Sequence, residues 1–138
     1  MKPILIACVA ILLSTACADA QVAVIANRSV PETSLTPAQL LDLYQLNTRT
    51  WSDGQVVELM CLRENPDVER RFFDLLGRNP LELRKVWLRA QLSGRARPPV
   101  MISAQDDMVR QVATTRGAVG FVARDKVQGN VKILLIIE

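Results

Sequence analysis

The feature that most constrains this chain is the stretch of residues 56–77, in which an apolar run leads directly into a helix that starts with proline. Residues 56–62 have the sequence VVELMCL, which is typical of a strand covered on both faces. Asn65 is a favourable N-cap, Pro66 suits the first helical position, and Gly77 stands where the helix is expected to end. The sequence therefore predicts a strand, a tight turn and a helix in immediate succession.

The turn between this strand and this helix is the first candidate site. A helix N-terminus presents unpaired N–H groups and the positive end of the helix dipole, and Arg63 lies beside it. An oxyanion suits such a place, and the candidate ligand-binding residues are Arg63, Asn65 and Asp67. The carboxylates of Glu64, Asp67 and Glu69 can instead satisfy the same N–H groups themselves. An anion site and an ordinary self-capped helix are both compatible with this turn.

The rest of the chain alternates apolar runs with helical patterns. Short apolar runs that predict strands occupy residues 22–26, 100–102, 117–122 and 131–137. Helical patterns occupy residues 36–47, 80–92 and 103–114, and the first two are expected to start at Thr36 and Asn79, each followed by proline. Strands that alternate with helices predict an α/β fold, in which helices cover a sheet with parallel members.

Several local features complete this prediction. The helix over residues 80–92 carries apolar residues on more than one side, so we expect it to be buried broadly. Ser103, with Asp106 three residues later, is expected to cap the next helix. Trp51, in the turn of residues 51–54, is expected to fill the core beneath that turn rather than to bind a ligand.

The first twenty residues have the pattern of a secretory signal peptide. Lys2 gives a basic start, residues 4–13 form an apolar segment, and residues 18–20 form a small-x-small cleavage site. The apolar segment is too short for a membrane anchor. A lipoprotein signal that ends at Cys17 is the competing interpretation, although Ser14 occupies a position that is usually aliphatic in such signals. We therefore expect residues 1–20 to be removed and residues 21–138 to form a periplasmic or secreted domain.

The composition argues against an enzyme. The chain contains no His, it has no glycine motif that grips phosphate, and Cys61 is the one cysteine left after cleavage at residue 20. Metal catalysis, Ser/His triads and Cys/His pairs are therefore unsupported, and we expect neither a metal nor a cofactor. Because Cys61 lies in an apolar run, we expect a buried structural thiol, and a redox thiol is the less favoured alternative. Aromatic residues are only 4% of the chain, which argues against nucleic-acid binding.

A second candidate site is the basic loop of residues 95–99, which have the sequence RARPP. Arg95 and Arg97 can bind an anion or the acidic surface of a protein partner, or they can simply be solvated. The charges of Lys2 and Asp19 cancel, so residues 21–138 keep the net charge of +3. This charge favours anionic partners only weakly.

Three segments in the same order resemble the phosphate-type substrate-binding proteins of bacterial ABC transporters, and in particular their short, single-lobe relatives. The segments are residues 22–27 (VAVIAN), residues 35–44 (LTPAQLLDLY) followed by 51–54 (WSDG), and residues 117–122 (GAVGFV). Residues 93–99 (SGRARPP) also fit the pattern of the short relatives. Each segment alone is weakly diagnostic, but their order is more specific and covers nearly all of residues 21–138.

The resemblance implies one lobe of a type II periplasmic-binding-protein fold, similar to the second of the two lobes that close on the anion in full-length members. It also implies a non-enzymatic domain that binds phosphate or a similar oxyanion and serves an ABC permease. In the family, this lobe presents an Arg and then a Gly-Ser-Gly-Thr-like turn at a helix N-terminus. Arg63 matches the Arg, whereas Pro66 removes a donor and Glu64 and Asp67 add repulsion.

The alternative function is protein–protein interaction without ligand binding. In this interpretation the chain keeps the lobe fold without the ligand and docks to an envelope or membrane-protein partner through Arg95 and Arg97.

Overall fold

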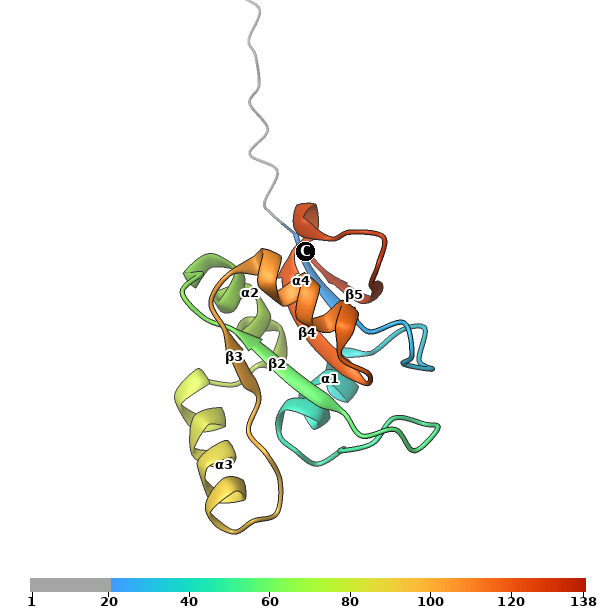
Figure 1. Cartoon of the computed structure of the whole chain (residues 1–138). Coiled ribbons are helices and arrows are strands. Elements are labelled where there is room, and N and C mark those ends of the chain that lie inside the picture. The colour runs from blue at the N-terminus through green and yellow to red at the C-terminus, as the bar shows by residue number, and fades with distance from the viewer. Residues whose placement is uncertain (1–20) are drawn as a thin grey trace, which may run out of the picture.

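A computed structural model describes residues 21–138, so the expected signal peptide and Cys17 lie outside the described residues (Figure 1). The described strands are β1 (Val22–Ala26), β2 (Glu58–Leu62), β3 (Val100–Ile102), β4 (Ala118–Ala123) and β5 (Lys132–Ile137). The described helices are α1 (Pro37–Tyr44), α2 (Pro66–Leu76), α3 (Pro80–Leu92) and α4 (Gln105–Thr114), with a short 3-10 helix η1 (Arg124–Lys126).

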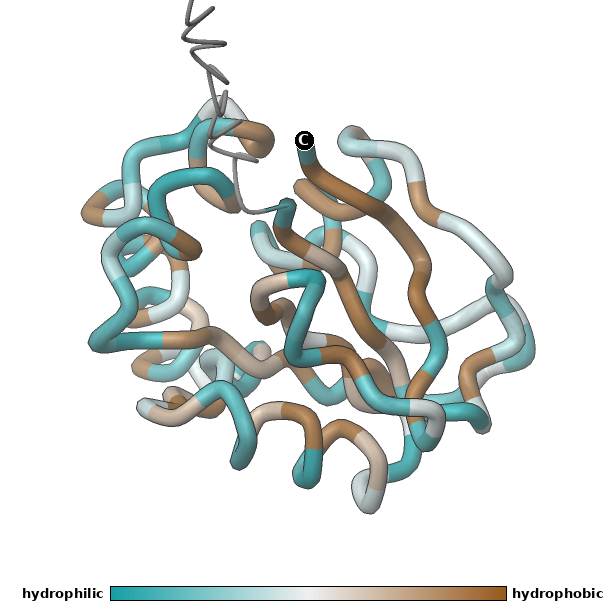
Figure 2. The backbone as a smooth tube through the Cα atoms, turned by 90° about the horizontal axis from the view of Figure 1, so that it is seen from above, coloured by the Kyte–Doolittle hydropathy of each residue, from teal (hydrophilic) through white to brown (hydrophobic). Residues whose placement is uncertain are grey.

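The strands form one five-stranded mixed sheet in the order β3-β2-β4-β1-β5. β2 runs parallel to β3 and to β4, whereas β1 is antiparallel to both β4 and β5. β1 and β4 lie inside the sheet, and every residue of both is buried. The expected mixed sheet is therefore confirmed, and Figure 2 shows hydrophobic residues concentrated along its strands.

Helices cover both faces of the sheet. Phe121 of β4 stacks on Phe72 of α2 with ring centroids 3.7 Å apart, and Tyr44 of α1 meets the edge of Phe72 at 4.9 Å. The preceding residue, Gly120, faces α4, because a Cβ placed there would lie 2.5 Å from the sulfur of Met108. Successive residues of a strand point to opposite faces, so α1 and α2 lie on one side of the sheet and α4 on the other.

The hairpin before β2 is held to the sheet as the sequence predicts. Trp51 is 4% exposed, and its indole N–H donates to the carbonyl oxygen of Gly117 at 2.9 Å, which confirms its place in the core. Gly117 has a φ of 78°, and a Cβ added to it would lie 2.3 Å from the carbonyl oxygen of Val56. Only glycine permits this close approach of two backbone segments.

The prediction that α3 is broadly buried is wrong. Leu83, Trp87 and Ala90 are its buried residues. In contrast, Leu81, Leu88 and Leu92 are 61%, 54% and 79% exposed. The physical reason is that α3 lies at the periphery beside β3, where nothing in the described chain covers its outer side (Figure 1).

The predicted start of α4 is also wrong by one residue. Its N-cap is Ala104, whose side chain cannot cap, and Ser103 is not the cap. The Ser103 hydroxyl instead accepts a hydrogen bond from the Nε–H of Arg63 at 3.0 Å. A contact between residues forty positions apart has therefore replaced a local cap.

Candidate functional site

The first candidate site lies at the carboxyl edge of the sheet, which we define as the edge where the parallel strands β2, β3 and β4 end. Arg63 follows β2, Ser103 follows β3, and the N-termini of α2 and α4 begin just beyond them (Figure 1). The N–H of Arg63 donates to the carbonyl oxygen of Ile102 at 2.9 Å, and the Ser103 hydroxyl holds its Nε. The guanidinium of Arg63 is thus tied across the ends of two strands, on an exposed surface.

The turn from β2 to α2 leaves donors at the helix start. Glu64 adopts the left-handed conformation with a φ of 64°, and Asn65 is the N-cap as predicted. The Asn65 side chain makes no capping hydrogen bond, however, so it does not satisfy the N–H groups of Asp67 and Val68. Pro66 has no N–H to offer. The turn therefore leaves two uncapped backbone donors near Arg63.

The carboxylates of this turn bind a different donor, the N–H of the N-cap residue itself. One oxygen of Glu69 accepts a hydrogen bond from the Asn65 N–H at 3.1 Å. Asp67 pairs with Arg70 at 3.3 Å, and both of these side chains are exposed. The self-capping expected from the sequence thus involves Glu69 and the N-cap residue, and it does not extend to Asp67 or Glu64.

The electrostatics of the turn are close to balanced. The turn carries three carboxylates, on Glu64, Asp67 and Glu69, and two guanidiniums, on Arg63 and Arg70. An anion at the helix start would meet one guanidinium and the helix dipole, opposed by carboxylates within the same turn. Among residues 21–138 no group of three His, Cys, Asp or Glu side chains is placed to hold a metal ion.

Cys61 lies in β2 behind the helix start. It is 1% exposed, and burial raises the pKa of its thiol to about 12, with a further upward push from the Glu69 carboxylate that the Arg84 guanidinium opposes. The expected buried thiol is confirmed. A thiol in this state is protonated and unreactive at neutral pH.

The second candidate site, the loop with Arg95 and Arg97, lies at the other end of β2. Both arginines are exposed, and the carbonyl oxygen of Arg95 accepts a hydrogen bond from the guanidinium of Arg49. Arg97 lines a groove of about 480 Å³ together with Val56 and Val100. At about 3.3 Å per residue, β2 separates this groove from Arg63 by roughly 16 Å. The two candidate sites are therefore distinct surfaces.

Solved structures share this fold. An ABC-type phosphate transport receptor from Vibrio cholerae superposes with a TM-score of 0.65 at 20% identity, over 84% of this chain and 46% of the receptor. A protein from Clostridium perfringens, assigned as a phosphate ABC transporter substrate-binding protein and solved with bound phosphate, gives 0.68 at 16% identity, over 84% and 45%. The chain has the fold of one lobe of a phosphate-type periplasmic binding protein.

A third structure, PstS from Borrelia burgdorferi, matches this binding-protein lobe with a TM-score of 0.59 at 10% identity, over 83% of this chain and 47% of PstS. The chain thus spans about half the length of these structures. No protein-family model and no curated protein matches the sequence.

The role of Ser103 at the carboxyl edge escaped the sequence analysis. Ser103 was expected to cap α4, and nothing local to it signals a bond to Arg63 across two parallel strands. Glu69, in contrast, accepts a backbone N–H at the helix start as the sequence predicts, although the donor is the N-cap residue Asn65. Such contacts follow from strand pairing and turn geometry, which a short sequence window does not contain.

Proposed function

We propose that this lobe is a solute-binding domain that captures phosphate or a similar oxyanion for an ABC permease. The observation that carries the proposal is the Arg63 guanidinium, which Ser103 holds beside the uncapped N–H groups of α2. The likeness of the fold to phosphate transport receptors supports it.

In this proposal capture is reversible and involves no chemistry. The oxyanion accepts hydrogen bonds from the free Nη groups of Arg63 and from the N–H groups of Asp67 and Val68 at the positive end of α2. Glu64 and Glu69 limit the affinity, and the described lobe supplies one wall, so the anion stays solvated on its other side. Tight binding therefore requires a second surface.

The proposed location is the periplasm or the exterior, reached through the signal peptide expected in residues 1–20. In the alternative interpretation, the chain is exported as a lipoprotein and is held in the same compartment by a lipid on Cys17. Within residues 21–138, no helix has the length and apolar character needed to cross a membrane.

Thermal unfolding of the purified chain tests the ligand. We expect phosphate to raise the melting temperature by several degrees, because a ligand at about 100 times its Kd adds roughly 2.7 kcal/mol of stability. Arg63→Ala should abolish this increase, whereas Arg89→Ala, which removes an exposed guanidinium from α3, should retain it. Chloride at matched ionic strength serves as the salt control, and sulfate tests whether another oxyanion binds.

Two outcomes would contradict the proposal. An equal increase in wild-type protein and Arg63→Ala would show that phosphate binds elsewhere. Equal increases with phosphate and with chloride would show a general effect of salt.

A second candidate function is an interaction module that has lost the ligand. The observation that favours it is the groove beside Arg97, where Val56 and Val100 are 63% and 50% exposed. Exposed apolar side chains beside the cations Arg95 and Arg97 suit an acidic protein partner in the cell envelope. A melting temperature that does not respond to phosphate would favour this function.

A further inference from the structure

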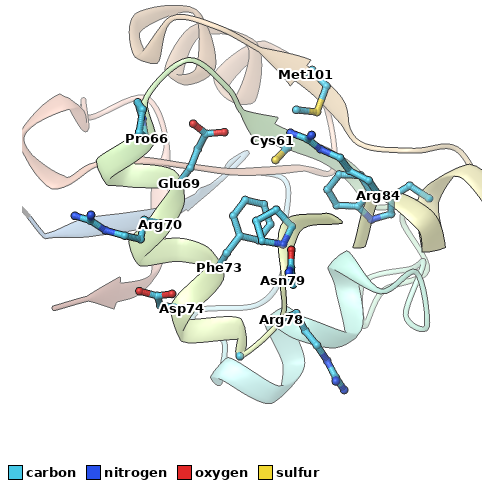
Figure 3. Close-up of a pocket in the computed structure, with 13 residues that line it drawn as sticks. Cys61, Pro66, Glu69, Arg70, Phe73, Asp74, Arg78, Asn79, Arg84 and Met101 are labelled. Carbon is cyan, nitrogen blue, oxygen red and sulfur yellow. The ribbon is translucent and has the colours of Figure 1, made fainter. Parts of the chain in front are cut away.

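A groove of about 640 Å³ lies between α2 and α3, and neither candidate function uses it (Figure 3). Cys61 of β2 and Met101 of β3 lie at its base. The rings of Phe73 from α2 and Trp87 from α3 line its sides, and both are largely buried. Its volume falls within the range of about 300–1,000 Å³ that is usual for small-molecule sites. The groove thus offers an aromatic bed of ligand size.

Two side chains of opposite charge face this bed. Glu69 projects from α2 and Arg84 from α3, and both point toward Cys61 (Figure 3). Their proximity to Cys61 is also evident in its thiol, whose pKa the Glu69 carboxylate raises and the Arg84 guanidinium lowers. The carboxylate and the guanidinium therefore reach the base of the groove from its two helices.

Glu69 and Arg84 both retain polar atoms that can bind a ligand. Among residues 21–138 no ion pair joins Glu69 to Arg84. One Glu69 oxygen accepts the Asn65 N–H, which leaves the other oxygen available. Arg70, Asp74 and Arg78 also line the groove, but in Figure 3 their side chains do not point toward Cys61 as those of Glu69 and Arg84 do.

We propose that this groove binds a small apolar zwitterion, the chemistry of a free α-amino acid with a hydrocarbon side chain. The ligand's ammonium group donates to Glu69, its carboxylate accepts from Arg84, and its side chain lies on Phe73 and Trp87. A simple anion is attracted by Arg84 but repelled by Glu69, and a simple cation meets the reverse. Only a ligand with both charges satisfies both walls.

This proposal is separate from the proposed capture of an oxyanion. Glu69, near the start of α2, borders both sites, but the zwitterion site depends on Arg84 of α3 and the oxyanion site depends on Arg63. Loss of one activity therefore leaves the other testable.

A ligand-observed NMR titration of the purified chain tests the proposal. We compare L-leucine with N-acetyl-L-leucine, which lacks the ammonium group, and with L-leucinamide, which lacks the carboxylate. We expect L-leucine to bind at least tenfold more tightly than either analogue, because each analogue leaves one wall charge unpaired.

Two variants test which residue binds each charged group of the ligand. Glu69→Gln should remove the preference for L-leucine over N-acetyl-L-leucine, and Arg84→Gln should remove the preference over L-leucinamide. Glu82→Gln and Arg89→Gln, which remove the same charges from exposed positions of α3 outside the groove, should leave both preferences unchanged. Glutamine keeps a hydrogen-bond acceptor at position 69, so the contact with the Asn65 N–H can persist in the variant.

The proposal is overturned if L-leucine binds no better than its blocked analogues. It is also overturned if Arg84→Gln and Arg89→Gln have the same effect. Displacement of L-leucine by phosphate in wild-type protein but not in Arg63→Ala would place the amino acid at the carboxyl edge and would equally remove the groove as its site.

Discussion

At the residue scale, Cys61 shows how burial alone sets the chemistry of a side chain. Its thiol lies in β2 beneath α2 and α3, and the pKa of about 12 keeps it protonated. The nearby phenol of Tyr44 is shifted in the same direction, because burial raises its pKa well above the usual value and the charge of Cys61 adds to that. The interior of this sheet therefore disfavours negative charge.

We expect the free energy of unfolding to fall as the pH rises from about 9 toward 12. The unfolded thiol loses its proton near the ordinary value of 9.0, while the native thiol keeps it until about 12. The unfolded state then binds fewer protons than the native state, so stability decreases by up to about 1.4 kcal/mol per pH unit. Urea unfolding between pH 8 and 9.5, below the ordinary value of 10.0 near which the unfolded Tyr44 phenol ionises, measures the onset of this slope.

Cys61→Ala is the matched variant for this measurement. Its smaller side chain lowers stability by an amount that does not depend on pH, so only the change in slope reports on the thiol. Equal slopes in the variant and the wild-type protein would show that the pKa of Cys61 is not raised.

The residues that sequence analysis placed correctly are those whose partners lie a few positions away. Thr36 caps α1 and exchanges hydrogen bonds with Gln39, and Asn79 caps α3 by accepting the Leu81 N–H at 2.9 Å. Asn65 occupies its predicted N-cap position, but its backbone angles give its side chain no capping bond. Local rules thus predict where a helix begins, and the backbone path decides which group satisfies the helix end.

At the scale of one element, α3 contacts the rest of the protein through a narrow strip of buried side chains. Leu83, Trp87 and Ala90 are buried, and the indole N–H of Trp87 donates to the carbonyl oxygen of Tyr44 at 2.7 Å. The sequence shows apolar residues on several sides of this helix, but it does not show which sides meet a neighbour. The expectation of broad burial failed for that reason.

We expect Leu83→Ala and Leu92→Ala to have very different effects on stability. Leu83 is 1% exposed, so its truncation removes buried surface and leaves a cavity that costs about 2–4 kcal/mol. Leu92 is largely exposed, so its truncation should cost less than about 0.5 kcal/mol. Leu and Ala are both strong helix formers, so intrinsic helix propensity contributes little to the difference. Chemical denaturation of the two variants measures it, and equal losses would mean that the outer side of α3 is covered.

At the scale of the whole molecule, the sheet gathers chain ends that are far apart in sequence. The alternation of strands and helices predicted the α/β class, and the family resemblance implied the single lobe. The strand order β3-β2-β4-β1-β5 did not follow from any local pattern, because β1 pairs with β4 and β5 near the other end of the described chain. The carboxyl edge, and with it the contact between Arg63 and Ser103, exists only once that order is set.

We expect the stabilisation by phosphate to depend on protein concentration. One lobe supplies one wall, and a second copy that faces the carboxyl edge would complete the cleft and exclude water from the anion. The increase in melting temperature should then grow with protein concentration, and sedimentation should show a phosphate-dependent dimer. An increase that is the same at all protein concentrations, with a constant sedimentation coefficient, would show that one lobe binds phosphate unaided.

The position of β1 also bears on when this sheet can assemble. Val22 pairs with Ala123 on one side and with Ile137 on the other, so the first described strand is flanked by the last two. During synthesis β1 therefore remains without its partners until residues 118–137 have been made. Contacts between such distant segments close slowly, because the whole intervening loop must be ordered first. This topology gives a newly made chain a long interval without its sheet.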